Sequence, residues 1–434
     1  MVQVGAGKRK IIIPEEILPI EKFHKVHDDI HARVLCIRSD EDFVLVSLEL
    51  TSLREYEIRK LRRMISERLN IQEKYIWICV THTFSAPHTR SEKQLLKPEI
   101  RRTNDCFCQA LEQAVEEALT EAVHALQEAQ ICCLSDCSDV NINRDEETPD
   151  GWWLGFDDSG FSDKTLPVVC FKDPAGKPIA VLYNYDVQSS IMDNVLNSEG
   201  YRHISGDLAG RASRYVEERY PGSVVFFLLG AAGDQAPRLK AQMDARKKGT
   251  ITEAEKDALY SAGFAYIDKA GAELGRDVVR TVENNNCNGK ENICRQKKNR
   301  CKNDVSRMQL SRKVIVCDGQ VPPADMHDLH ATRSYNYRKN GQLETPIDIL
   351  ILEDMAFIGV QPELCSITAS QIRKESPYPL TFVMTMVNGI AKYMADEKSY
   401  ERMSYEAMNS GFGKGSAELL RDEAIRLLKS AESE

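Results

Sequence analysis

The chain lacks a long apolar run, a leader sequence and an excess of positive charge. Its longest apolar stretches, such as residues 224–232, are far shorter than the ~20 residues that cross a membrane. The first ten residues carry charge but no apolar segment typical of a signal peptide. Lys and Arg total 57 against 66 Asp and Glu, and the net charge of -9 argues against binding to nucleic-acid backbones. We therefore expect a soluble, cytoplasmic protein without nucleic-acid or membrane partners.

Cysteine is present but not at the density of a disulfide scaffold. The 13 cysteines are spread over 434 residues and their number is odd. A polar stretch at residues 284–303 holds three of them at a spacing of seven, which fits neither CxxC nor a usual zinc module. Four others lie in apolar, strand-like runs where buried thiols are common, namely Cys36, Cys79, Cys170 and Cys317.

The short motifs of several common enzyme classes are also missing. No GxGxxG follows a predicted strand, and neither HExxH nor GxSxG occurs in the sequence. Nothing local in the sequence therefore supports a nicotinamide-cofactor site, a helical HExxH zinc site or the nucleophilic serine of a hydrolase.

Alternating strand and helix patterns predict a layered α/β protein. Helical periodicity covers residues 55–69, 105–127, 207–219, 253–283 and 417–430, with Ser416 as the N-cap of the last helix. Because no Pro/Gly/Ser-rich linker is present, we predict one large domain over residues 1–434, with a mixed, largely buried sheet and flanking helices. Apolar runs between turn residues predict strands at residues 32–37, 43–50, 75–80, 168–171, 178–185, 223–229, 313–317, 347–360 (a hairpin turning at Glu353 and Asp354) and 380–387.

Two long segments show no strong periodicity. Residues 136–166 hold Trp152, Trp153, Phe156 and Phe161 among glycines and acids, and we interpret them as an ordered aromatic loop. Residues 284–311 are very polar, and we expect a flexible loop there.

Five predicted strands run directly into short polar loops. In open α/β sheets, ligands bind outside the carboxyl ends of the strands, so we expect these loops to form the site. Together they offer an imidazole, amides, carboxylates and a phenol, a composition typical of acid/base or metal chemistry. The loops are residues 81–88, 184–190, 230–237, 359–364 and 388–393.

The first of these loops resembles a known family. Residues 81–87, Thr-His-Thr-Phe-Ser-Ala-Pro, resemble the Thr-His-Thr-His-Ser-(Ala or Gly)-Pro turn of the neutral/alkaline (non-lysosomal) ceramidases. The resemblance spans nearly the whole chain in order, and from it we expect the catalytic domain of that family without the C-terminal β-domain of the longer members. Further segments resemble the family in the same order along the chain: residues 2–14, 27–33, 143–144, 204–210, 230–237, 362–363 and 388–393.

The resemblance implies a zinc site. In the ceramidases, zinc held by two histidines, a glutamate and a tyrosine activates water to cleave an N-acyl amide. The matching residues here are His82, Glu363 and Tyr393. Gln188 stands where the family has its second histidine, and a carboxamide is a weaker zinc ligand than imidazole. We expect a zinc ion, or another divalent metal, at these four residues.

Two more departures fall in the same presumed pocket. Phe84 replaces the second histidine of the turn, and Ala236 replaces a serine that some ceramidases carry. The missing ligand leaves three possibilities: another histidine takes its place, the metal is bound weakly, or the site has changed its function. His88 and His203 are the candidate replacements.

Other polar residues are candidates for catalysis or substrate binding. Asp234 and Glu49 are candidate general bases or carboxylates that support the metal ligands. Arg144 is a candidate anchor for a carboxylate or a carbonyl oxygen. Two loop tryptophans are candidate pocket walls, and two turn glycines could offer N–H groups to an oxyanion: Trp152, Trp153, Gly230 and Gly233.

These observations favour one function and leave two rivals. The leading hypothesis is a metal-dependent hydrolase that cleaves an amide or related C–N bond of a small soluble substrate. The first rival is a metal-free, ligand-binding pseudoenzyme. It is supported by the three departures from the family at Phe84, Gln188 and Ala236. The second is a hydrolase or lyase without metal that uses Asp234 and His82 as an acid/base pair.

Overall fold

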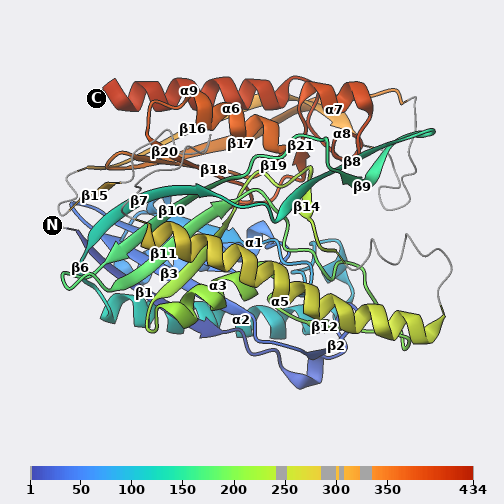
Figure 1. The fold of residues 1–434 in the computed structure, drawn as a ribbon, viewed down its shortest axis with the longest axis horizontal. Coiled ribbons are helices and arrows are strands. Elements are labelled where there is room, and N and C mark those ends of the chain that lie inside the picture. Colours follow the sequence, from blue (N-terminus) through green and yellow to red (C-terminus); the bar gives the residue numbers. More distant parts are fainter. Residues whose placement is uncertain (1, 241–251, 285–299, 303–306, 323–334, 434) are drawn as a thin grey trace.

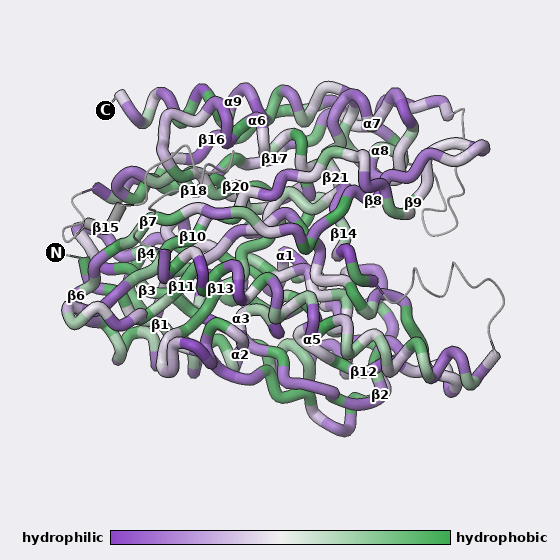
Figure 2. The backbone as a smooth tube through the Cα atoms, in the orientation of Figure 1, coloured by the Kyte–Doolittle hydropathy of each residue, from purple (hydrophilic) through white to green (hydrophobic). Residues whose placement is uncertain are grey.

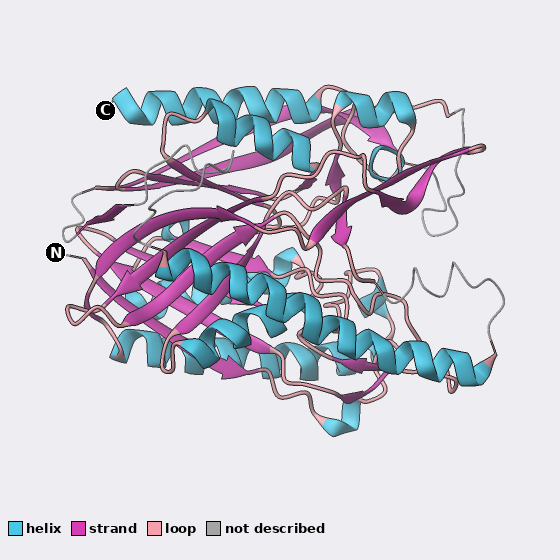
Figure 3. Ribbon diagram, viewed as in Figure 1, coloured by secondary structure: helices cyan, strands magenta, loops and turns pink. Residues whose placement is uncertain are grey.

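Three larger mixed sheets lie between helices on opposite sides of the molecule (Figures 1 and 3). Helices α6 and α9 cover one side, and α1, α2, α3 and α5 cover the other sheets. This arrangement is the layered α/β architecture that the sequence predicts. The structure, a computed structural model, describes residues 2–240, 252–284, 300–302, 307–322 and 335–433.

The first sheet is built by the N-terminal part of the chain. Its strand order is β5-β4-β3-β1-β6, in which β4 and β5 pair in parallel and the other neighbours are antiparallel. Helix α2 (Pro98–His124) packs on β1 and β3, where Gly5 and Gly7 let the backbones approach closely. The other elements of this part are β1 (Gln3–Lys10), β3 (His31–Arg38), β4 (Asp42–Leu48), α1 (Glu55–Leu69), β5 (Ile76–Val80) and β6 (Gln127–Glu128).

The second sheet has the order β13-β11-β10-β7-β15. Strands β11 and β13 are parallel neighbours, and helix α3 is part of the crossover connection between them. Helix α5 packs against α3 and begins with a capping box at Thr252 and Glu255. The elements are β7 (Gln130–Cys137), β10 (Thr165–Lys172), β11 (Pro178–Tyr185), α3 (Asp207–Arg219), β13 (Val224–Leu229), α5 (Glu253–Glu283) and β15 (Arg300–Lys302).

The third sheet comes from the C-terminal part and has the order β16-β17-β18-β20. Its outer face carries α6 and α9, which pack on each other. The elements are β16 (Met308–Val321), β17 (Arg338–Leu352), β18 (Met355–Val360), α6 (Ser366–Glu375), β20 (Leu380–Met384) and α9 (Ser416–Ser433).

Shorter elements complete the fold. Three of them form a small sheet, β14-β8-β9, and two pairs are parallel, β12 with β2 and β19 with β21. Their bounds are β2 (Phe23–Val26), β8 (Asn141–Thr148), β9 (Gly151–Asp157), β12 (Arg202–Ile204), β14 (Gln235–Pro237), β19 (Glu363–Leu364), β21 (Tyr393–Met394), α7 (Glu397–Arg402), α8 (Tyr405–Met408) and the 3-10 turns Glu15–Ile17, Glu73–Tyr75 and Gln94–Leu96.

The cores explain why the layers stay together. One apolar cluster joins all three sheets, with Leu45, Phe226 and Phe357 as members from each. The inner strands β11 and β13 are largely hydrophobic along their length, whereas α9 mixes hydrophilic and hydrophobic residues (Figure 2). A helix that covers one face of a sheet needs only one apolar side, and burial of such sides is the main stabilising contribution.

Most of the predicted elements are confirmed. The helices at residues 55–69, 207–219 and 253–283 and the strand at 178–185 have the predicted bounds. The hairpin predicted at 347–360 is confirmed with its turn at Glu353 and Asp354, but its first strand, β17, begins earlier, at Arg338. Two helices begin earlier than predicted: α2 at Pro98 and α9 at Ser416, which is a helical residue instead of the N-cap. Proline at the first position starts a helix without any apolar periodicity.

The segment predicted as an ordered aromatic loop at residues 136–166 is ordered, but it is not a loop. It contains the β8–β9 hairpin, which turns at Pro149 and Asp150, and Gly151, the first residue of β9, has a φ of 128°. Polar residues fill β8 because it borders a polar cluster and not an apolar core, so the usual alternation is absent. Of the predicted flexible loop at 284–311, residues 285–299 and 303–306 lie outside the described residues, whereas 308–311 belong to β16.

Cysteine and membrane features complete the fold. Cys36, Cys79, Cys170 and Cys317 are free and buried, as predicted. Cys132 and Cys137 are each disulfide-bonded, and their separation along the one strand β7 is too long for a bond with each other. Disulfides are typical of oxidising compartments, and the cytoplasmic location therefore stays a prediction. Among the helices that the structure describes, none combines the length and the apolar character that a bilayer crossing requires.

Candidate functional site

The polar loops meet at the carboxyl ends of the strands. His82 follows β5 and Gln188 follows β11, and a bridge between Thr83 and Ser189 holds these two loops side by side. Glu363 in β19 and Tyr393 in β21 are direct partners in a parallel pair. Backbone pairing therefore brings the four expected metal ligands together from four separate loops.

His82 and Glu363 form the centre of this cluster. The Nδ1 atom of His82 lies 2.6 Å from the carbonyl oxygen of Thr51, and Nε2 lies 3.2 Å from Oε1 of Glu363. Both side chains are buried, and His82 has a left-handed backbone with a φ of 54°. Such a conformation costs of order 1–3 kcal/mol in a non-glycine residue and is frequent at functional sites.

The two side chains shift each other's protonation. Burial lowers the pKa of His82, but the charge of Glu363 and the hydrogen bonds to Glu363 and Thr51 together raise it more, so the net direction is upward. Burial raises the pKa of Glu363, but His82 and Arg144 lower it more, and the net direction is downward. Glu363 is therefore an anion that favours a positive charge beside it, on the imidazole or on a bound cation.

Gln188 links this pair to Arg144. Its Nε2 donates to Oε1 of Glu363 at 3.0 Å, and its Oε1 accepts from Arg144 at 2.9 Å. The amide thus presents its nitrogen to the carboxylate and its oxygen to the guanidinium. Swapping the two ends would place an oxygen against Glu363 and a nitrogen against Arg144, so these neighbours fix the amide's orientation.

Arg144 is the second charged centre. It is buried, and it donates to Oε1 of Glu406 from Nε at 2.9 Å and from a terminal nitrogen at 2.7 Å. The same terminal nitrogen donates to the hydroxyl of Tyr393 at 3.2 Å. Burial lowers the pKa of Arg144, but Tyr393 and Glu406 raise it well above its usual value, so the guanidinium stays charged.

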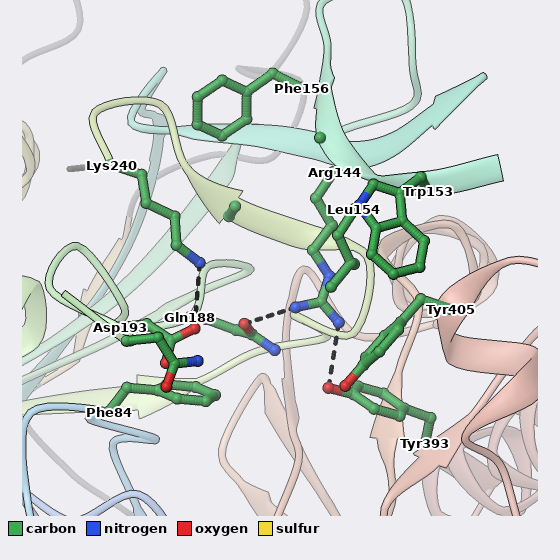
Figure 4. A pocket seen from close by; sticks show the side chains of 13 residues that line it. Phe84, Arg144, Trp153, Leu154, Phe156, Gln188, Asp193, Lys240, Tyr393 and Tyr405 are labelled. Carbon is green, nitrogen blue, oxygen red and sulfur yellow. Dashed lines mark hydrogen bonds and ion pairs between the residues drawn. The ribbon is translucent and has the colours of Figure 1, made fainter. Parts of the chain in front are cut away.

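A cavity of about 290 Å³ lies above these residues (Figure 4). Arg144 and Lys240 enter it from opposite sides, and Gln188 lies between them. This volume is at the lower end of the range for small-molecule sites. The lining residues are Phe84, Arg144, Trp153, Leu154, Gly155, Phe156, Gln188, Asp193, Asn194, Ala236, Lys240, Tyr393 and Tyr405.

The donor atoms fit a metal ion in part. Nε2 of His82 is buried without a hydrogen-bond partner among the described residues, and it faces a carboxylate oxygen. In the neutral ring, Nδ1–H bonds to Thr51 and Nε2 carries the lone pair, which is the tautomer that binds zinc. No group of three or more His, Cys, Asp and Glu side chains with metal-site geometry occurs in the described part of the chain. An ion at His82 and Glu363 would therefore need the weaker oxygen ligands of Gln188 or Tyr393.

The two candidate bases do not join this cluster. Glu49 accepts from the backbone N–H of His31 and pairs with Arg33, and both carboxylate oxygens are engaged there. Asp234 accepts from the N–H of Ser366 at 2.8 Å and from the side chain of Asn143 at 3.2 Å. Neither carboxylate lines the cavity, so these contacts do not support the acid/base pair of Asp234 with His82.

The two replacement histidines also lie elsewhere. His88 is 2.6 Å from Glu21, and His203 packs against the rings of Tyr260 and Phe264. Within the described residues, neither histidine lines the cavity or contacts His82. The missing ligand is therefore not replaced by imidazole from these two positions.

Of the aromatic and glycine candidates, some line the cavity and others lie elsewhere. Phe84 and Trp153 line the cavity, whereas Trp152 lies under the guanidinium of Arg402 at 4.5 Å from its ring centre. The N–H groups of Gly230 and Gly233 donate to the carbonyls of Tyr185 and Leu364. Because both N–H groups already donate hydrogen bonds within the fold, neither is free to donate to an oxyanion.

The cavity and cluster residues that were missed in the sequence include four with ionisable side chains. Glu406 and Tyr405 lie in the short helix α8, and Asp193 and Lys240 lie in loops without a motif. The run Tyr-Glu-Ala-Met carries no signal of its own, because a single acid in a short helix is usually a surface residue. Only the burial of Glu406 beneath Arg144 distinguishes it.

The fold is similar to that of solved ceramidases. A structure described as "Ceramidase complexed with C2" matches with a TM-score of 0.72 and 14% identity, over 100% of this chain and 75% of that chain. Neutral ceramidase from Pseudomonas aeruginosa matches with a TM-score of 0.72 and 16% identity, over 99% of this chain and 75% of that chain. No protein-family model and no curated protein sequence matches this chain. The resemblance read from the motifs is thus confirmed at the level of the fold.

Proposed function

We propose that this protein is a hydrolase that cleaves the amide bond of a small acyl substrate. The proposal is carried by one observation, the meeting of His82, Glu363, Gln188, Arg144 and Tyr393 beneath a small cavity. The ceramidase-like fold adds support, because it places these residues at the carboxyl ends of the strands. Fold alone does not fix an activity, so the residues decide.

A divalent metal, most simply zinc, is part of the proposal. His82 and Glu363 would hold it, with the oxygen of Tyr393 as a weaker ligand. The oxygen of Gln188 would join them only if its amide turned away from Arg144. When bound, such an ion lowers the pKa of its water to ~7 and polarises a carbonyl group. Because only two of the four are strong donors, we expect weaker binding than at a site with two histidines.

The chain's own residues bind and orient the substrate. Arg144 and the hydroxyl of Tyr393 offer donors to the carbonyl oxygen of the scissile amide, on which negative charge develops. Burial and the charge of Glu363 raise the pKa of Tyr393 well above its usual value, so its phenol keeps the proton that it donates. Phe84, Trp153 and Phe156 give the cavity apolar walls that hold an acyl group and exclude water.

Substitution of Glu363 tests the proposal. Protein supplied with zinc should hydrolyse members of a panel of small N-acyl amines, and Glu363→Gln should lower kcat/KM by at least about 100-fold, since even an outer partner of a metal ligand contributes 10–100-fold. Glu401→Gln, an exposed carboxylate paired with Lys414, is the matched control and should keep full activity. Equal activity of wild type and Glu363→Gln would contradict the proposal.

A second candidate, a metal-free binding protein, is favoured by a different observation. The bonds from Arg144 to Gln188 and from Gln188 to Glu363 satisfy these groups without any ion. A protein of this kind would bind a small ligand in the same cavity and leave it unchanged. The metal content of the purified protein distinguishes the two candidates, because the binding protein would hold no metal ion and the hydrolase would hold one.

A further inference from the structure

The cavity contains a second cation that the proposed chemistry does not use. Lys240 lines the cavity on the side opposite Arg144, and its side chain is only 11% exposed (Figure 4). Among the described residues its one anionic partner is Asp193, whose Oδ2 lies 3.6 Å from Nζ. This distance is longer than a normal hydrogen bond. The ammonium group, with three N–H donors, is therefore incompletely satisfied.

The surroundings of Lys240 disfavour its charge. Burial lowers the pKa of Lys240, and the positive charge of Arg144 lowers it further, against the opposing effect of Asp193. Of the described residues that line the cavity, Asp193 is the one carboxylate, against two cations. Arg144 already has Glu406 as its partner, so the unmet demand for an anion is at Lys240.

The lining also limits what kind of anion fits. Phe84, Trp153 and Phe156 cover much of the wall, and a volume of about 290 Å³ leaves room for a small molecule only. A single negative charge matches the single ammonium better than a phosphate dianion does, because Asp193 beside Lys240 would repel the dianion about twice as strongly. A carboxylate on a short, partly apolar amide has the charge and the size that this cavity accepts.

We propose that Lys240 binds a carboxylate of the substrate, and that the substrates are small amides bearing a carboxylate, such as N-acyl amino acids. This inference rests on the proposed function for its reaction but not for its binding step. The scissile carbonyl lies against Arg144 and Tyr393, and the carboxylate lies against Lys240 across Gln188. Lys240 thus determines specificity, and it takes no part in bond cleavage.

Two pairs of compounds test the inference by equilibrium binding. N-acetylphenylalanine is compared with N-phenethylacetamide, and N-acetylleucine with N-isopentylacetamide; in each pair the second compound lacks only the carboxylate. Wild type should bind each acid about 10- to 100-fold more tightly than its neutral twin, the range expected for a hydrogen bond between charged groups. Lys240→Met should lose this preference, and it should bind the neutral compounds as tightly as wild type does.

Control variants complete the design. Lys240→Arg keeps the charge and should retain most of the preference, and Lys414→Met removes an exposed lysine and should behave as wild type. If Lys240→Met does not fold, Lys240→Gln carries the same comparison. A preference for the acid that survives in the Lys240 variants, or a wild type that binds acid and twin equally or binds neither, would overturn the inference.

Turnover of the same compounds separates this inference from the proposed function. The zinc-supplied protein could bind the acids through Lys240 without hydrolysing them. This result would support the carboxylate site and contradict the proposed hydrolase activity. Hydrolysis of the neutral twins with kcat/KM equal to that of the acids would keep the hydrolase and overturn the role of Lys240.

Discussion

Nε2 of His82 and Oε1 of Glu363 lie 3.2 Å apart in a buried site, and Nε2 has no hydrogen-bond partner among the described residues. Two lone-pair atoms at this distance repel each other unless a proton or a cation lies between them. Gln188 contacts the same carboxylate oxygen, and Arg144 contacts Gln188. The function of the site depends on which positive charge His82 and Glu363 share.

Replacing Gln188 by histidine should strengthen metal binding. An imidazole at this position would add a third strong donor to His82 and Glu363 and would remove the amide bond to Glu363. We expect the zinc affinity of Gln188→His to rise by at least about tenfold, since supporting partners of metal ligands alone contribute that much. Competition with a chelator of known affinity measures this change.

Gln188→Asn is the matched control for that variant, because it keeps the amide but shortens the side chain. Its zinc affinity should not rise. If Gln188→His binds zinc no more tightly than wild type, the residue at position 188 does not reach the ion, and the four-residue metal site is wrong.

Removing the charge of Arg144 should destabilise the fold. Arg144→Met would leave Glu406 buried without its partner, and breaking a buried ion pair on one side costs about 3–5 kcal/mol. The double variant Arg144→Met with Glu406→Gln should recover part of this loss. Denaturant unfolding measures both, and a single variant as stable as wild type would show that Arg144 does not neutralise Glu406.

Asp234 should make the stability depend on pH. Burial raises the pKa of Asp234 from 3.8 to about 7, against the hydrogen bond from Ser366. A carboxyl group that binds its proton more tightly in the folded state stabilises the protein fully below pH ~4, and this contribution is lost as the pH rises through 7.

Asp234→Asn should therefore flatten the fall in stability over that interval. The expected change in slope is up to about 1.4 kcal/mol per pH unit, the effect of one proton. Urea unfolding at several pH values between 4 and 7 measures it, with exposed Asp422→Asn as the control. An unchanged slope in Asp234→Asn would mean that this carboxyl group does not titrate as described.

The sequence predicted the convergence of the loops better than the contacts within the site. His82, Gln188, Glu363 and Tyr393 each follow a strand, and parallel strands deliver their carboxyl ends to one edge, so a pattern along the chain was enough. The resemblance to the ceramidases assigned a role to each of these four positions. The motif does not reveal that the carboxylate of Asp234 accepts from the backbone N–H of Ser366 and lies outside the cavity lining.

The contacts of Arg144 and Lys240 could not be predicted from the sequence. The sequence indicates Arg144 as a substrate anchor but gives no sign of its ion pair with Glu406, which is distant in sequence and belongs to a short helix. The β8–β9 hairpin was taken for a loop because its polar residues face this cluster instead of an apolar core. Strands that border a polar site lack the alternation by which strands are recognised.

The metal content of the purified protein tests the central claim most directly. Wild type, purified without added metal or chelator and then dialysed against zinc, should hold about one ion per chain by elemental analysis, and His82→Ala should hold far less. His88→Ala, a histidine paired with Glu21 outside the cluster, should match wild type. No metal in wild type after zinc is supplied, or equal zinc in His82→Ala, would contradict a metal-dependent hydrolase at His82 and Glu363.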